Sequence, residues 1–136
     1  MKRMLTIELL ELDDKISIEL CDQQSPRTVR AIVDSLPISL TLNRWGDELY
    51  SDETSVKVGE ENGTSAVDLF DVAFWPEGSA ICLFYGYTPL SRQGKIIPYS
   101  NVNVVGRIKS KPNDIPGFLN SIEKTYIKPK TPLALL

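Results

Sequence analysis

Six carboxylates lie between residues 47 and 61 and are the first side chains in this sequence to consider for chemistry. Paired carboxylates can act as acid and base on a glycosidic bond or hold a hard cation. Their spacing assigns them to no single site, and the Gly, Asn and Thr residues among them are typical of an exposed loop. We therefore expect a solvated acidic surface and predict no metal site. The carboxylates concerned are Asp47, Glu48, Asp52, Glu53, Glu60 and Glu61.

Histidine is absent from the chain, which excludes Ser-His-Asp triads, Cys-His pairs and most transition-metal sites. Cys21 and Cys82 are far apart, each within a predicted strand, so we expect two reduced, packed thiols in a cytoplasmic protein. An enzyme with this composition would depend on carboxylates, Arg, Lys, Tyr, backbone dipoles or a bound cofactor. No motif predicts a cofactor, and the composition leaves open whether the chain is an enzyme.

Acidic residues are concentrated in the first part of the chain, because residues 1–80 carry 16 Asp and Glu against 7 Lys and Arg, while residues 81–136 carry 2 against 8. Arg92, Lys95, Arg107, Lys109 and Lys111 could accept an anion, but we expect a solvated face whose charge the acidic half neutralises. The net charge of −3 gives no indication of nucleic-acid binding. No apolar run reaches the roughly 20 residues that a membrane span needs.

Apolar alternation with a period of two predicts a hairpin from residues 5–9 and 16–20, with the turn at Asp13-Asp14. Ser25 followed by Pro26 is typical of a helix N-cap and first turn, and an apolar stripe predicts a helix over 26–35. Strand patterns then return in the segments 38–43, 48–51 and 54–58.

The stretch VAFWPEGSAICLFYGYTPLS, residues 72–91, is rich in aromatic side chains. We interpret it as part of two strands, 66–75 and 79–86, joined by a turn at Pro76-Glu77-Gly78, with most of its aromatics in the barrel wall and core. A further strand ends in VVGRI, and Ile115, Phe118, Leu119 and Ile122 then follow at helical spacing.

The proposed elements amount to about eight short strands and two short helices. Strands this numerous and turns this close together predict a mainly β fold, a closed eight-stranded antiparallel barrel capped by the two helices. We expect a single domain over residues 1–136, with residues 125–136 as an extended C-terminal tail.

Three motifs in register support a more specific assignment: NRWGDELY, DVAFWPEGSAICLFYGYTPLS and IPYSNVNVVGRI. Together they resemble a small prokaryotic cyclophilin-like family described as a domain of unknown function, an atypical relative of the cyclophilin peptidyl-prolyl isomerases. The resemblance covers roughly residues 1–124 and implies the cyclophilin-like barrel.

The same resemblance implies candidate site residues. Arg44 stands where the isomerases place the arginine that donates to the substrate amide, and would be the catalytic donor. Trp45 either covers one end of the barrel or stacks on a ligand. The remaining candidates for a ligand-binding groove are Leu49, Tyr50, Leu83, Phe84 and Tyr99.

Three functions remain open from the sequence. The isomerase histidines and glutamine have no counterpart here, so we favour a binding module for a small molecule or an extended peptide, without classical isomerase activity. The alternatives are a prolyl isomerase that uses Arg44, and a subunit of an amide-hydrolysing complex. Either a homo-oligomer or a complex with a protein partner is compatible with the sequence.

Overall fold

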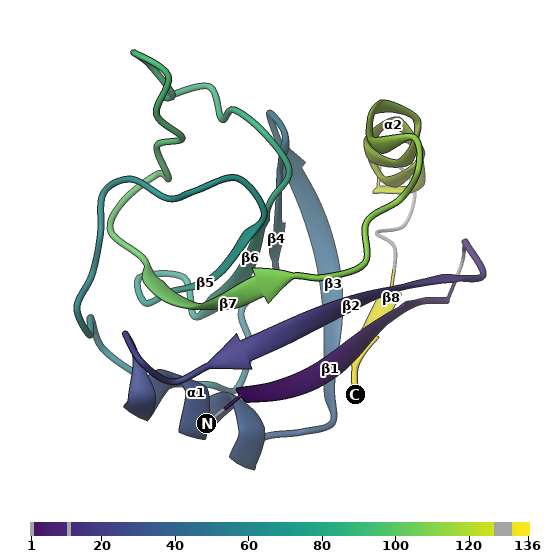
Figure 1. The fold of residues 1–136 in the computed structure, drawn as a ribbon. Helices are drawn as coiled ribbons and strands as arrows, with labels where there is room; N and C mark the ends of the chain where they lie inside the picture. Colours follow the sequence, from purple (N-terminus) through teal and green to yellow (C-terminus); the bar gives the residue numbers. More distant parts are fainter. Residues whose placement is uncertain (1, 11, 127–131) are drawn as a thin grey trace.

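The computed structural model describes residues 2–10, 12–126 and 132–136 of the chain. Its strands close into a barrel in the order β1-β2-β7-β5-β6-β4-β3-β8, with every neighbouring pair antiparallel (Figure 1). The expected mainly β fold, a closed eight-stranded barrel with two short helices, is confirmed. The strands are β1 (Lys2–Leu9), β2 (Asp14–Cys21), β3 (Ile38–Trp45), β4 (Glu48–Ser51), β5 (Asp71–Trp75), β6 (Ala80–Phe84), β7 (Asn103–Ile108) and β8 (Pro132–Leu135).

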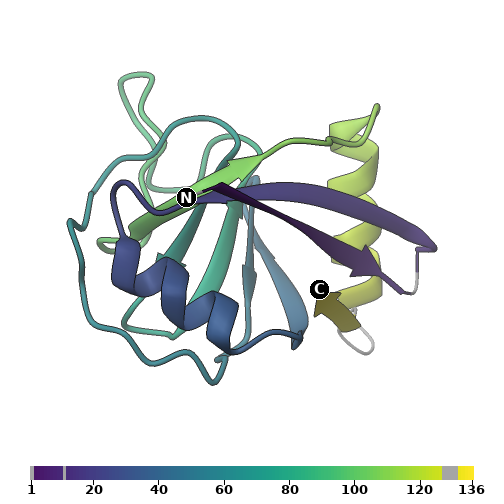
Figure 2. The same cartoon turned by 60° about the horizontal axis from the view of Figure 1, so that its bottom comes forward.

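The helix α1 (Pro26–Asp34) packs at one end of the barrel, with Val29 and Ile32 completely buried (Figure 2). Its first turn differs from the prediction, because the Ser25 side chain makes no capping hydrogen bond. The carboxylate of Glu61 occupies that position instead and accepts from the backbone N–H groups of Arg27 and Thr28, at 3.0 and 2.9 Å. The cap therefore comes from a residue distant in sequence.

The helix α2 (Ile115–Tyr126) lies on the other side of the barrel, against β3. The stripe expected from its spacing is buried, since Phe118, Leu119 and Ile122 all belong to the main core. Of the residues 125–136 predicted as an extended tail, 125 and 126 belong to this helix and 132–135 form β8, while 127–131 lie outside the described residues. Within the described ranges, no helix is both long enough and apolar enough to cross a membrane.

The segment 54–58, expected from the sequence as a strand, is not part of the barrel. The backbone of 54–58 forms no strand, and Thr54 instead hydrogen-bonds to the Ser79 carbonyl oxygen at the turn before β6. The place in the barrel is taken by β8, which pairs with β1 on one side and β3 on the other. Proline is tolerated at the first position of a strand, where Pro132 stands.

Apolar side chains form two separate clusters on the two faces of the barrel wall. The larger cluster fills the interior and includes Leu49 and Leu83. The smaller cluster is built on Ala73, Cys82 and Phe84, which alternate with interior residues and so face outward. Segments between the strands cover this outer face, where Val67 bridges to Ile96. The candidate site lies in this outer layer.

Candidate functional site

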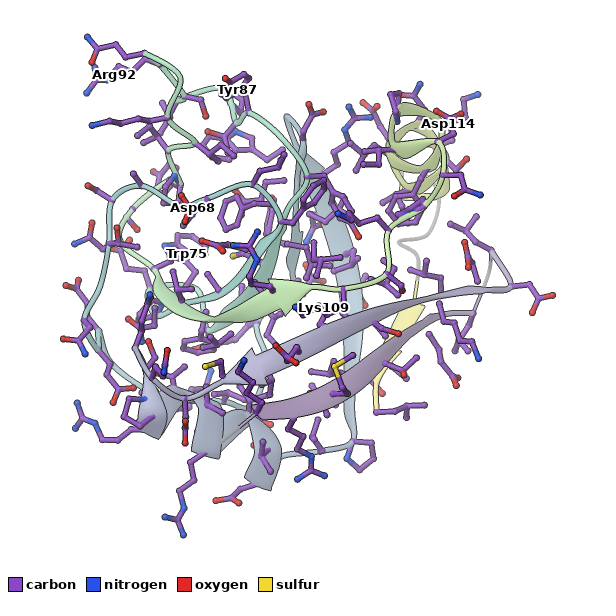
Figure 3. All side chains as sticks on the ribbon, in the orientation of Figure 1. Asp68, Trp75, Tyr87, Arg92, Lys109 and Asp114 are labelled. Atoms are coloured by element: carbon purple, nitrogen blue, oxygen red, sulfur yellow. The ribbon has the colours of Figure 1, made fainter. Side chains whose placement is uncertain are left out.

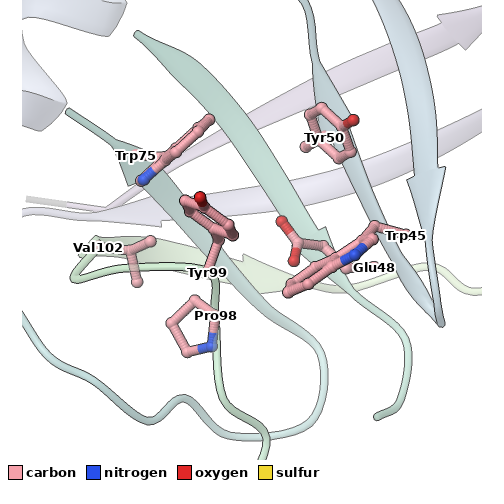
Figure 4. A pocket seen from close by; sticks show the side chains of 7 residues that line it. All are labelled: Trp45, Glu48, Tyr50, Trp75, Pro98, Tyr99 and Val102. Atoms are coloured by element: carbon pink, nitrogen blue, oxygen red, sulfur yellow. The ribbon is translucent and has the colours of Figure 1, made fainter. Parts of the chain in front are cut away.

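A pocket of about 280 Å³ opens in the outer layer, beside the cluster on β4, β5 and β6 (Figure 4). This volume is close to the lower end of the range for small-molecule sites, about 300 Å³. Four aromatic rings and one carboxyl group dominate its walls. The lining residues are Trp45, Glu48, Tyr50, Trp75, Pro98, Tyr99 and Val102.

Tyr99 stands between the two tryptophans and connects the sides of the pocket. Its ring meets Trp45 and Trp75 edge to face, with centroids 6.1 and 5.7 Å apart. Trp75 is fixed in turn, because its Nε1–H donates to the Ser100 hydroxyl at 2.6 Å. The Tyr99 side of the pocket faces solvent, since that residue is 68% exposed. Figure 3 shows Trp75 below the loop that carries Tyr87 and Arg92, and far from α2.

Glu48 supplies the carboxyl group of the pocket. The residue is only 5% exposed, and its Oε1 atom has no hydrogen-bond partner among the described residues. Its carboxyl group lies between the rings of Tyr99 and Trp45 (Figure 4). Burial raises the pKa of this carboxyl to about 7, and a hydrogen bond from the Cys82 thiol opposes that shift. Near neutral pH, the pocket therefore holds a carboxyl group that can gain or lose a proton.

Strand pairing explains why Glu48 points outward. Glu48 and Tyr50 are two positions apart on β4 and pair with Phe84 and Cys82, both of the outer cluster. The turn before β4 is fixed by Asp47, whose N–H donates to the Tyr87 carbonyl oxygen and whose carbonyl accepts from the Tyr85 N–H, each at 2.9 Å. Two backbone hydrogen bonds therefore tie Asp47, the residue before Glu48, to the segment 85–87 and fix the start of β4.

The structure brings together only some of the predicted site residues. Trp45, Tyr50 and Tyr99 line the pocket. Phe84 is completely buried in the outer cluster that supports the pocket. Leu49 and Leu83 are cross-strand partners in the barrel interior, on the opposite face of the wall from the pocket. Their predicted roles in binding stay predictions.

Arg44 does not line the pocket, and its guanidinium group is bonded to protein acceptors. Its Nε donates to the Gly46 carbonyl oxygen at 2.7 Å, and one terminal nitrogen reaches Asp47 at 3.2 Å. The other terminal nitrogen contacts Asn120 and Glu123 of α2, at 3.0 and 3.1 Å. These bonds join the β3–β4 turn to α2. A substrate amide that used Arg44 would have to replace them.

Four of the lining residues were missed from the sequence: Glu48, Trp75, Pro98 and Val102. Glu48 was assigned to a solvated acidic surface, and Trp75 to the barrel wall. The first assignment was wrong for both Glu48 and Glu61, which are buried. The alternation in Glu48-Leu49-Tyr50 was the available signal, because it places the carboxylate on the same face as the predicted ligand-binding tyrosine. In the described part of the chain, no three Cys, Asp or Glu side chains are grouped so as to hold a metal ion.

The amino-acid sequence of the chain matches one known protein family. The family described as cyclophilin-like matches residues 3–126, nearly the whole chain. The chain belongs to the cyclophilin-like family. This agrees with the resemblance noted in its sequence motifs.

Two solved structures share the cyclophilin-like barrel. The hypothetical protein AF2241 from Archaeoglobus fulgidus is 41% identical, with a TM-score of 0.71, and the match covers 98% of this chain and 93% of that one. McbB, solved in complex with tryptophan, also has a TM-score of 0.71 but only 14% identity, over 96% of this chain and 43% of McbB. That likeness shows the fold alone. No curated protein matches the chain.

Proposed function

We propose that this cyclophilin-like protein binds a small, mainly apolar molecule in the pocket on the outer face of its barrel. The observation that carries the proposal is the lining itself, in which aromatic rings surround one carboxyl group with an unpaired oxygen. Apolar walls with a few well-placed polar groups are the usual composition of small-molecule sites. McbB, which shares the fold, was solved with the aromatic small molecule tryptophan.

A small molecule fits the geometry better than an extended peptide does. An added peptide strand needs an open sheet edge, and each strand of this barrel already pairs on both sides. The pocket is also short, because Tyr99 meets both tryptophans across it. We therefore favour a compact ligand that enters from the exposed side of Tyr99.

Binding can be tested with the chain's own tryptophans. Trp45 and Trp75 are the only two in the sequence, and both line the pocket, so fluorescence excited at the indole band and the two indole N–H peaks report on this site alone. We expect 2-phenylethanol to shift both peaks in a saturable way. Tyr99→Ala should weaken this binding about tenfold, since it removes an aromatic contact.

Tyr87→Ala is the matched control, because Tyr87 is an exposed tyrosine of the neighbouring loop and does not line the pocket. It should bind 2-phenylethanol as the wild type does. Unmoved indole peaks in the wild type, or equal affinities in Tyr99→Ala and the wild type, would contradict the proposed function.

Isomerase activity that depends on Arg44 stays an alternative, as does a role in an amide-hydrolysing complex, because a fold alone assigns no activity. We expect no acceleration of Xaa-Pro isomerisation in a tetrapeptide, since the Arg44 donors bind Gly46, Asp47 and α2. Acceleration by the wild type that is lost in Arg44→Ala would establish the isomerase alternative. A partner protein that co-purifies under gentle lysis would instead support the complex.

A further inference from the structure

The carboxyl group of Glu48 lacks the partner that a buried charge requires. Its Oε1 atom is shielded from solvent and accepts no hydrogen bond from the described residues. No lysine or arginine is among the residues that line the pocket. A carboxylate left buried without a cation or enough donors is costly, so a ligand that supplies a charged donor recovers more free energy here than a neutral one does.

The aromatic walls favour the same sign of charge. Trp45, Tyr50, Trp75 and Tyr99 all line the pocket, and the face of an aromatic ring carries the negative part of its quadrupole. A cation placed over such faces gains about 0.5–2 kcal/mol, with more when it is shielded from water. An anionic ligand would meet both the ring faces and the Glu48 carboxylate unfavourably.

We infer that the natural ligand is an amine, a protonated nitrogen on a small apolar body, whose ammonium group donates to Glu48 while its apolar part packs between the aromatic rings. This inference rests on the proposed function and narrows it to one ligand class. The ammonium group would compensate the charge of this carboxylate, whose Oε1 atom has no hydrogen-bond partner among the described residues. The edge-to-face rings of Tyr99 and the tryptophans would enclose the apolar part.

We attribute the pH dependence of binding to Glu48 itself. The titratable groups around it are the thiol of Cys82 on β6, which hydrogen-bonds to it, and two tyrosines that share the pocket lining, Tyr50 on β4 and Tyr99 in the covering segment. Burial raises the pKa of the Cys82 thiol further above neutrality, so it stays protonated. Two charged residues near it in sequence, Arg44 and Asp47, pair with each other on the turn.

Amine binding should strengthen as pH rises through 7. Below its pKa of about 7, Glu48 is protonated and loses its attraction for a cation. An alkylammonium group, with a pKa of about 10, keeps its charge throughout this range. We expect affinity about tenfold weaker at pH 5.5, where Glu48 is neutral, than at pH 8.5, and release of a proton on binding near pH 7.

Three probes of one shape test the inference: 2-phenylethylamine, 2-phenylethanol and 3-phenylpropionate carry a positive, a neutral and a negative group. With the tryptophan readouts at pH 8, the amine should bind at least about tenfold more tightly than the alcohol, and the acid most weakly. Glu48→Gln should remove the preference for the amine and its pH dependence. Glu77→Gln, an exposed change on the turn after Trp75, should keep both.

The outcomes separate this inference from the proposed function. Equal binding of amine and alcohol by the wild type, or an amine preference that survives in Glu48→Gln, would overturn the inference and leave small-molecule binding intact. Failure of all three probes to move the indole peaks would overturn both. The pH dependence in the wild type needs no variant, so it tests the inference even if Glu48→Gln folds poorly.

Discussion

Glu61→Ala should lower the free energy of unfolding by about 3 kcal/mol. The Glu61 carboxylate accepts from the backbone N–H and the hydroxyl of Thr28, at 2.9 and 2.8 Å, and from the backbone N–H and Nε of Arg27, at 3.0 and 3.2 Å. It therefore caps α1 with a charge, which also suits the positive end of the helix dipole. Alanine would leave these donors without an acceptor. Urea unfolding of both proteins at pH 7 measures the loss.

The network around Glu61 adds to this expectation. The Glu61 N–H donates to Asn103 Oδ1 at 2.8 Å, while Asn103 Nδ2 donates to Thr28 and to the Gly59 carbonyl oxygen, at 3.1 and 3.0 Å. These bonds tie α1, β7 and the segment before Glu61 together in a region closed to solvent. Loss of one member therefore weakens the contacts between all three elements.

The Glu61 contribution should disappear in acid. Burial alone would raise the pKa of this carboxyl, but the hydrogen bonds from Thr28 and Arg27 lower it to about 2. The depressed pKa means that the contribution is complete above the unfolded value of about 4.5 and is lost as pH falls towards 2. The wild type and Glu61→Ala should thus converge near pH 2. The neighbouring change Glu60→Ala, at an exposed carboxylate, should cost less than about 0.5 kcal/mol; equal losses for the two alanine variants would contradict the capping role.

Glu48 should affect stability in the opposite direction. Its pKa is raised by burial to about 7 in the folded protein, against about 4.5 when unfolded. Between these values the folded state holds a proton that the unfolded state has lost, so stability is greatest below pH 4.5, falls as pH rises towards 7 and levels off above it. The difference in pKa corresponds to about 3 kcal/mol.

Glu48→Gln isolates this contribution, because glutamine has nearly the same shape and does not titrate. The stability of the variant minus that of the wild type should grow by about 3 kcal/mol between pH 4.5 and pH 8 in urea unfolding. Asp71, whose pKa burial also raises, is present in both proteins and cancels in the difference. Glu77→Gln should follow the wild type at each pH. Parallel pH curves for the wild type and Glu48→Gln would show that the Glu48 carboxyl is not desolvated.

Glu48 and Glu61 come from the same acidic segment and behave oppositely because of their neighbours. Glu61 meets a helix N-terminus and several donors, so its charged form is stabilised. Glu48 meets aromatic rings and a thiol, so its charged form is disfavoured. We infer that the first carboxylate serves the fold and that the second serves binding.

The sequence by itself determined the strands and helices that are set by the pattern of residues near one another along the chain. Alternation of apolar residues located the hairpin β1–β2 and showed which side chains face the interior, because a strand repeats every two residues. The stripe through Phe118, Leu119 and Ile122 located α2 in the same way. Three motifs in register predicted the family, and with it Trp45, Tyr50 and Tyr99, all of which line the pocket.

Only the tertiary structure decided the features that join distant parts of the chain. The segment 54–58 has a strand-like pattern, yet β8 closes the barrel, because pairing depends on which partners are available and not on the pattern alone. Ser25 is a residue type that often caps helices, yet the carboxylate of Glu61 accepts the hydrogen bonds at the start of α1. The environment of Glu48 likewise depends on β6 and on Tyr99, far along the chain. A carboxylate's neighbours set its charge, and spacing along the sequence does not reveal neighbours that folding brings from elsewhere.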